Sequence, residues 1–237
     1  MEYSSKKKIE RTILVISAHP DDEILGCGAS IAKWTAAGDI VHIVIMAEGE
    51  TSRDMVRNRD AKNEKLLLLE KSALRAGKIV GATSVKLLNF PDNRMDSLDM
   101  LDVVKAIENE IESVKPNMVV THHGGDLNID HRITHEAVIT ACRPQPEGFV
   151  KILLTFEVPS STEWRPAGSS AVFQPNWFED IGDTIDCKIE ALKVYQSEMR
   201  ERPHARSLKN VESLAQWRGG TVGYMFAEGF MLLRAIQ

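Results

Sequence analysis

The feature that most constrains the fold is a repeated alternation of short apolar segments with longer segments of helical periodicity. Residues 12–18 (TILVISA) are apolar and rich in β-branched side chains, which is typical of a buried strand. Residues 23–37 follow as a helix that ends at Gly38. Strands that alternate with helices of this length form mainly parallel sheets covered by helices on both faces. The sequence therefore predicts the α/β class, with a single domain over residues 12–237.

The other expected elements continue this pattern to the end of the chain. In the cleanest amphipathic helix, which Pro116 closes, the apolar residues are Leu98, Leu101, Val104, Ile107, Ile111 and Val114. A run of leucines over 66–69 is assigned to the core. Further strands are expected over 40–46, 85–89, 118–121, 152–158 and 229–236, and further helices over 55–80, 131–142, a segment from Ile181 to Tyr195, and a late segment opened by 203–207.

Charge and composition exclude several classes of function. The 29 basic and 34 acidic residues leave a net charge of −5, which argues against a large interface with nucleic-acid phosphates or an anionic membrane. No apolar run approaches the roughly 20 residues of a membrane-spanning helix. Three widely spaced cysteines indicate neither a disulfide framework nor a cysteine-based zinc finger. We therefore expect a cytoplasmic protein with a frayed polar tail over residues 1–11.

Polar side chains follow three of the expected strands, at the point where each strand ends. Residues 19–23 follow the first strand, residues 92–94 follow the third, and residues 122–131 follow the fourth. In open parallel sheets, ligands bind at the carboxyl ends of the strands. These three loops, although far apart in the sequence, are therefore expected to meet in one pocket.

The segment His19-Pro20-Asp21-Asp22-Glu23 has the residue types of a metal site. An imidazole and a carboxylate three residues apart across a strand-to-helix turn can face the same ion, and zinc accepts both ligand types. The spare carboxylate, Asp21 or Asp22, would be free to act as a general base on a water molecule. An acidic helix cap is the alternative explanation, but capping needs neither the histidine nor the proline.

A second candidate segment runs from Asp126 to His131, with His135 one helical turn further on. Either His131 or His135 could complete a set of two histidines and an aspartate, and a solvated position is favoured for His135. The adjacent His122 and His123 are either two more pocket residues or a strand end with one side chain on each face.

Ala18-His19-Pro20-Asp21-Asp22-Glu23, together with Asp130-His131 farther along the chain, resembles the PIG-L/LmbE family of zinc-dependent N-deacetylases. The resemblance implies a Rossmann-like α/β fold and an activity that removes acetyl groups from N-acetylglucosamine-type sugars. It implies that His19, Asp22 and His131 are the zinc ligands and that Asp21 is the general base. Asp130 would be a second residue of the catalytic motif. Asp92 and Arg94 would belong to the sugar-binding rim.

One position departs from the family pattern. Many members have His-Pro-Asp-His where this chain has Asn128-Ile129-Asp130-His131, and the first of these histidines helps to stabilise the oxyanion in the family. Asn128 can donate a hydrogen bond there but cannot carry a proton. Either another histidine takes that role, with His123 and His204 as candidates, or catalysis relies on zinc alone. The family arginine near the start of the long helix is assigned to Arg53, with Arg57 and Arg59 as competitors.

A substrate-binding rim is suggested by two further segments. Trp164 follows the fifth expected strand and offers an aromatic plate for a sugar face, although ordinary loop packing explains it equally well. His204 and Arg206 lie at the start of a late helix, where they would suit a phosphate or carboxylate. Solvated basic residues at a capped helix start are the alternative explanation.

The expected function is zinc-dependent deacetylation of a small-molecule amino sugar, either nucleotide- or lipid-linked or part of a glycoconjugate precursor. Another divalent ion is the alternative to zinc, because sites of two histidines and an aspartate accept several metals. The alternative functions are a zinc amidase for a non-sugar or thiol-conjugate amide, and a non-catalytic sugar- or metal-binding protein. A homo-oligomer is compatible with the sequence.

Overall fold

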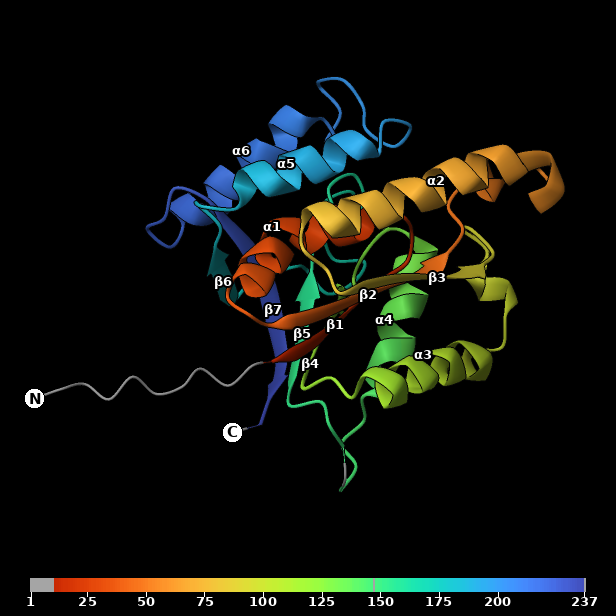
Figure 1. Cartoon of the computed structure of the whole chain (residues 1–237), viewed down its shortest axis with the longest axis horizontal. Coiled ribbons are helices and arrows are strands. Elements are labelled where there is room, and N and C mark those ends of the chain that lie inside the picture. Colours follow the sequence, from red (N-terminus) through yellow and green to blue (C-terminus); the bar gives the residue numbers. More distant parts are fainter. Residues whose placement is uncertain (1–10, 147, 237) are drawn as a thin grey trace, which may run out of the picture.

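A seven-stranded sheet forms the centre of the described residues, 11–146 and 148–236, in this computed structural model (Figure 1). The strand order is β3-β2-β1-β4-β5-β7-β6. Strands β1 to β5 pair in parallel, whereas β7 is antiparallel to both β5 and β6. The strands are β1 Thr12–Ser17, β2 Ile40–Ala47, β3 Ser84–Phe90, β4 Met118–His122, β5 Ile152–Phe156, β6 Trp177–Asp180 and β7 Ala227–Ala235.

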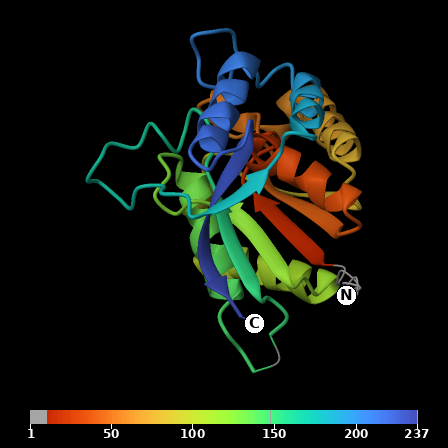
Figure 2. The same ribbon diagram turned by 90° about the vertical axis from the view of Figure 1, so that its left-hand side faces the viewer.

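Helices cover both faces of this sheet (Figures 1 and 2). On β1, Ile13 and Val15 pack into the core beneath one group of helices, and Leu14 and Ile16 pack beneath the other. The alternation follows from the two-residue period of a strand. The first group is α1 Asp22–Ala36, α2 Arg59–Ile79, α5 Ile185–Val194 and α6 Leu208–Gly220; the second is α3 Met100–Val114 and α4 Ile129–Ala141. Short 3-10 turns occupy Thr51–Arg53 and Met95–Ser97.

The predicted α/β class, with a mainly parallel sheet covered on both faces, is confirmed. Several details differ. Strand β6 was not predicted, because it is only four residues long and none of them is fully buried. Leu101 was placed on the buried face of α3 but is 63% exposed, and Val103 takes a core position instead. In α2, Leu67 and Leu68 of the leucine run are exposed, because only part of a helix surface can face the sheet.

The expected N-terminal tail, residues 1–11, is described only at its last residue. Residues 1–10 of the expected tail lie outside the described residues. Arg11 is held by Asp39, with 3.1 Å between Arg11 Nε and Asp39 Oδ2. None of the helices within the described ranges is long and apolar enough to cross a membrane.

The order of the strands fixes where a ligand can bind. From β1 the chain proceeds outward through β2 to β3, whereas β4 lies on the other side of β1 and leads to β5. Connections that leave two neighbouring strands in opposite directions open a crevice beyond the carboxyl ends of those strands. The loops after β1 and β4 contain the two histidine-aspartate segments singled out in the sequence, so the fold brings them to this crevice.

Candidate active site

The turn between β1 and α1 folds back on itself so that His19 and Asp22 face each other. The backbone N–H of His19 donates to Asp22 Oδ2 at 2.9 Å, and His19 Nδ1 lies 3.2 Å from the same oxygen. Asp21 occupies the N-cap position of α1 with a φ of 119°, a conformation that side chains other than glycine adopt rarely. Such strain persists only where the surrounding structure enforces it, and it is common at functional sites.

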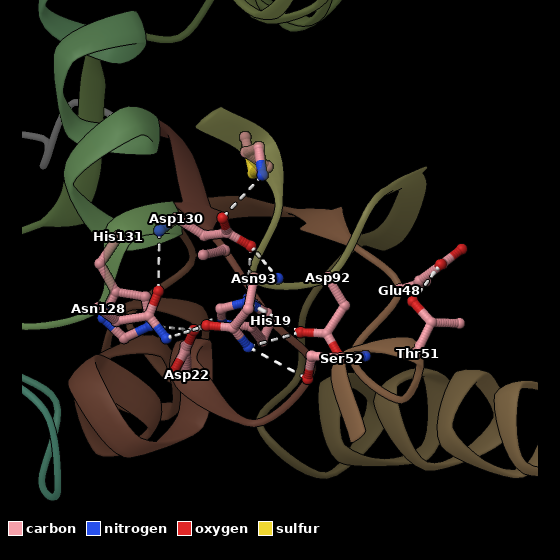
Figure 3. Close-up of polar contacts among 12 residues, drawn as sticks. His19, Asp22, Glu48, Thr51, Ser52, Asp92, Asn93, Asn128, Asp130 and His131 are labelled. Atoms are coloured by element: carbon pink, nitrogen blue, oxygen red, sulfur yellow. Dashed lines mark hydrogen bonds and ion pairs between the residues drawn. The ribbon is translucent and has the colours of Figure 1, made fainter. Parts of the chain in front are cut away.

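His131 completes a cluster of three metal-binding side chains. It lies in the first turn of α4, and its Nε2 is 3.1 Å from Asp22 Oδ2. One ligand atom each from His19, Asp22 and His131 lies within 4.8 Å of the others (Figure 3). Two imidazoles and one carboxylate form a donor set suited to zinc, and a catalytic zinc site uses three protein ligands and leaves a position open.

Each imidazole of the cluster contacts a second carboxylate through the ring nitrogen that does not face Asp22. His19 Nε2 lies 3.1 Å from Asp130 Oδ2, and His131 Nδ1 lies 3.2 Å from Asp126 Oδ1. Metal-binding histidines usually donate their outer N–H to a carboxylate or carbonyl in this way, which fixes the tautomer and the ring orientation. The remaining nitrogens, His19 Nδ1 and His131 Nε2, face Asp22. The residues present therefore fit a zinc ion.

Asp130 is buried and occupied by contacts with the protein. Its carboxylate accepts hydrogen bonds from the backbone N–H groups of Asn93 (2.6 Å) and Met95 (3.0 Å) as well as facing His19. Asp126 was not assigned a role from the sequence, because an aspartate in a loop before a helix has no distinctive pattern. Its carboxylate also accepts hydrogen bonds from the hydroxyls of Ser161 and Thr162. Both carboxylates are therefore in position to orient the histidines.

Replacing Asp126 with asparagine is expected to weaken zinc binding by about ten- to a hundredfold. The new amide can donate its N–H to His131 Nδ1. A neutral imidazole that accepts a hydrogen bond at Nδ1 carries its proton on Nε2, and a protonated Nε2 cannot bind a metal. Zinc affinity would be measured by competition with a chelator, and ligand geometry by the visible spectrum of the cobalt-substituted protein. Asp183→Asn, at an exposed loop position, is the matched control. An unchanged affinity and spectrum in Asp126→Asn would contradict this orienting role.

Asp21 lies beside the cluster and is only 2% exposed. Burial raises its pKa well above the ordinary range, the neighbouring charge of Asp22 raises it further, and Arg206 opposes both effects. Arg206 Nη1 lies 3.1 Å from Asp21 Oδ2. This ion pair was not predicted, because the two residues are 185 positions apart in the sequence. The arginine holds the carboxylate at the edge of the pocket.

Two further pKa values reflect the burial and the charge of the site. Burial raises the pKa of Glu23 to about 7, although the Tyr195 hydroxyl, which donates to Glu23 Oε1 at 2.5 Å, favours the charged form. Burial acts to lower the pKa of His131, but the charges of Asp22 and Asp126 outweigh it and raise the value to about 9. The carboxylates around His131 thus stabilise positive charge at this position.

A pocket of about 220 Å³ opens onto the cluster. A chain of side-chain amides and carboxylates forms one wall, where Asn128 Nδ2 donates to Asn93 Oδ1 at 2.8 Å and Asn93 Nδ2 donates to Asp92 Oδ1 at 2.8 Å (Figure 3). Asn128 also caps α4 by accepting the backbone N–H of Asp130. Positive φ angles at Asp21, Asn93 and Ser160, which all line the pocket, indicate that the surrounding loops fix its shape.

The structure brings most of the residues predicted for the site into this pocket. Arg53 lies there and pairs with Glu198 at 2.8 Å, whereas its competitors Arg57 and Arg59 bind Glu48 instead. The predicted residues that line the pocket are His19, Asp21, Asp22, Arg53, Asp92, Asn128, His131 and Arg206.

Four histidines or arginines considered from the sequence lie elsewhere. Arg94 donates to the backbone carbonyls of Asp54 and Met55, at 3.1 and 3.0 Å. His123 Nε2 contacts the carbonyl of Ala171 at 2.9 Å, and His135 Nδ1 contacts the carbonyl of His122 at 2.8 Å. His204 lines a neighbouring pocket. In each case a backbone contact or a turn of the loop directs the side chain away from the cluster.

Fold and pocket together define a class: α/β proteins with a cluster of candidate metal ligands at the switch point of a parallel sheet. Residues 14–142, more than half of the chain, match the model of the PIG-L family, described as GlcNAc-PI de-N-acetylase. The chain is also 32% identical to the uncharacterized deacetylase YaiS of Escherichia coli over 191 residues, which cover 78% of this chain and 90% of that protein. The chain therefore belongs to the PIG-L family and is a deacetylase, a hydrolase of amide bonds.

Solved structures share the fold at lower identity. The N,N'-diacetylchitobiose deacetylase of Pyrococcus horikoshii matches with a TM-score of 0.75 and 20% identity, covering 96% of this chain and 85% of that one. GalB of Pseudomonas putida, a 4-carboxy-2-hydroxymuconate hydratase, matches with a TM-score of 0.75 and 23% identity, covering 96% and 98%. The fold thus occurs in enzymes with different reactions, so the fold alone does not define the reaction.

Proposed function

We propose that the protein is a zinc-dependent hydrolase that removes the N-acetyl group from an amino sugar. The observation that carries the proposal is the position of Asp21, a buried carboxylate beside a cluster of His19, Asp22 and His131 that opens into a polar pocket. The family match supports amide hydrolysis as the reaction. Location in the cytoplasm stays a prediction from the sequence.

The metal would be held by His19 Nδ1, one oxygen of Asp22 and His131 Nε2. When bound, zinc supplies Lewis acidity that lowers the pKa of a coordinated water and polarises the acetyl carbonyl. Zinc is proposed rather than magnesium because two of the three ligands are imidazoles, whereas magnesium prefers oxygen ligands. Asp126 and Asp130 keep the two imidazoles in the required tautomers.

Asp21 is the proposed general base. It accepts a proton from the water as the water oxygen attacks the carbonyl carbon of the acetyl group. Arg206 keeps the Asp21 carboxylate oriented through its ion pair, and burial makes the carboxylate a stronger base than an exposed aspartate. The same carboxyl group can then return the proton to the departing amine nitrogen, so that acetate and a free amino sugar are released.

Asn128 is the proposed donor to the tetrahedral oxyanion. Its Nδ2 gives one hydrogen to Asn93 and has a second hydrogen available to the pocket. A neutral amide can stabilise the negative charge without exchanging protons. The histidines considered from the sequence for this role, His123 and His204, do not line the pocket, which leaves proton return to Asp21.

The sugar itself would be held by Asp92 and Arg53. Asp92 is buried, accepts the backbone N–H of Ser52 at 3.0 Å, and faces the pocket beside His19. Carboxylates are strong acceptors for sugar hydroxyls. The family model is described as GlcNAc-PI de-N-acetylase, and a structural relative is named for N,N'-diacetylchitobiose; both names contain an N-acetylated amino sugar.

Acetate release by the zinc-loaded protein over a panel of N-acetylated sugars tests the proposed function. The panel contains free, glycosidically linked, nucleotide-linked and lipid-linked N-acetylglucosamine, with non-sugar acetamides for comparison. Zinc-dependent release from one or more of the sugars is expected. Release from the non-sugar amides alone, or no release although zinc is bound, would overturn the proposal.

A further inference from the structure

A second pocket of about 550 Å³ adjoins the active-site pocket. The same two loops border both pockets. In the loop after β5, Ser160 and Ser161 face the active site, and Pro159 and Trp164 face the second pocket. In the loop before α6, Arg206 faces the active site and the residues from 203 to 205 face the second pocket. The two pockets are therefore immediate neighbours, and a ligand that contacts both has to be longer than one sugar ring.

The second pocket presents an aromatic ring in a fixed position. Trp164 is 50% exposed, and its ring lies edge-on to the ring of His204 at a centroid distance of 5.6 Å. The loop that carries it is tied down, because Glu163 accepts the backbone N–H groups of Ser160 at 2.7 Å and Ser161 at 3.2 Å. A large apolar face held half-exposed beside polar groups suits the apolar face of a sugar or another polyol ring.

The charge of this pocket opposes an anionic ligand. Its lining contains three carboxylates, Glu157, Glu163 and Glu201, and among the described residues no lysine or arginine lines it. Arg218 pairs with Glu157 at 2.7 Å, and the nearby Arg206 is paired with Asp21. A phosphate or diphosphate placed here would meet the carboxylates of Glu163 and Glu201, and no described lysine or arginine lines the pocket to bind it.

We propose that the second pocket is a subsite for an uncharged ring linked to the amino sugar, so that the enzyme acts on a neutral glycoside in preference to a nucleotide- or diphosphate-linked sugar. The inference rests on the proposed function for the position of the N-acetylated ring. The N-acetyl group lies in the active-site pocket, and the attached ring packs against Trp164.

The test compares Trp164→Ala with Trp217→Ala, which removes a tryptophan that is 68% exposed and outside both pockets. The probes are N-acetylglucosamine, N,N'-diacetylchitobiose and UDP-N-acetylglucosamine, and their binding is measured by calorimetry alongside acetate release. The native protein is expected to bind the disaccharide about tenfold more tightly than either other probe, since burying a ring face against Trp164 is worth about that much. Trp164→Ala should lose this preference, mainly through KM, and Trp217→Ala should keep it.

Equal binding of the monosaccharide and the disaccharide by the native protein, or tighter binding of the nucleotide sugar, would overturn the subsite. An unchanged preference in Trp164→Ala would also overturn it. Acetate release without a preference for the disaccharide would leave the proposed function intact and reject the subsite alone. Disaccharide binding that depends on Trp164, together with no acetate release from these probes or from the wider sugar panel, would support the subsite and reject the proposed function.

Discussion

Replacing Asp21 with asparagine is expected to lower kcat/KM for acetate release by at least about a hundredfold while zinc remains bound. The asparagine side chain would keep nearly the same shape but could not accept a proton from the attacking water or return one to the amine. The ligand atoms of His19, Asp22 and His131 are untouched by the change. Steady-state kinetics on the best sugar substrate and metal analysis of the same sample measure the two effects separately.

The control for this variant is Asp183→Asn, which makes the same chemical change in an exposed loop and should retain native kinetics. Loss of the ion pair with Arg206 is the main structural side effect, so the midpoint of thermal unfolding should be recorded for both variants. Near-native activity in a folded, zinc-loaded Asp21→Asn protein would rule out Asp21 as the base. Loss of zinc would show that Asp21 helps to form the metal site instead.

Much of the fold could be predicted because local patterns and long-range packing agree. The residues of β1 are apolar throughout most of the strand, and the structure buries Ile13 and Leu14 on opposite faces of the sheet. The error at Leu101 has a physical cause. Helical spacing identifies a stripe of apolar residues, but the contacts with the sheet and α4 decide how that stripe is rotated, and they bury Val103 instead.

The candidate site was predictable where its residues are close in the sequence. The turn from His19 to Asp22 places two ligand atoms together through local backbone hydrogen bonds, so its pattern could be recognised. The contacts between Asp21 and Arg206, and between Asp126 and Ser161, join segments that only the completed fold brings together. A lone arginine near a helix start or an aspartate in a loop carries no sign of its distant partner.

A deacetylase and a hydratase share this fold, so the residues of the site decide which reaction takes place. In this chain the deciding features are two histidines, each paired with a second carboxylate, and the buried carboxylate of Asp21 next to them. The amides of Asn128 and Asn93 add neutral hydrogen-bond donors along the pocket wall. This combination suits the attack of water on a neutral acyl group, in which negative charge develops on one oxygen.

Replacing His131 with alanine is expected to abolish stable zinc binding and to lower acetate release by more than about a hundredfold, because partners that only orient a ligand are already worth about ten- to a hundredfold. The variant removes one of the three ligands and leaves Asp126 without its imidazole partner. His135→Ala is the matched control, since His135 lies one turn further along α4 and contacts the carbonyl of His122 instead of the cluster. Metal content after dialysis against a weak chelator, followed by activity with zinc restored, measures both effects. Full zinc content and activity in His131→Ala, or equal losses in both variants, would refute the assignment of His131 as a ligand.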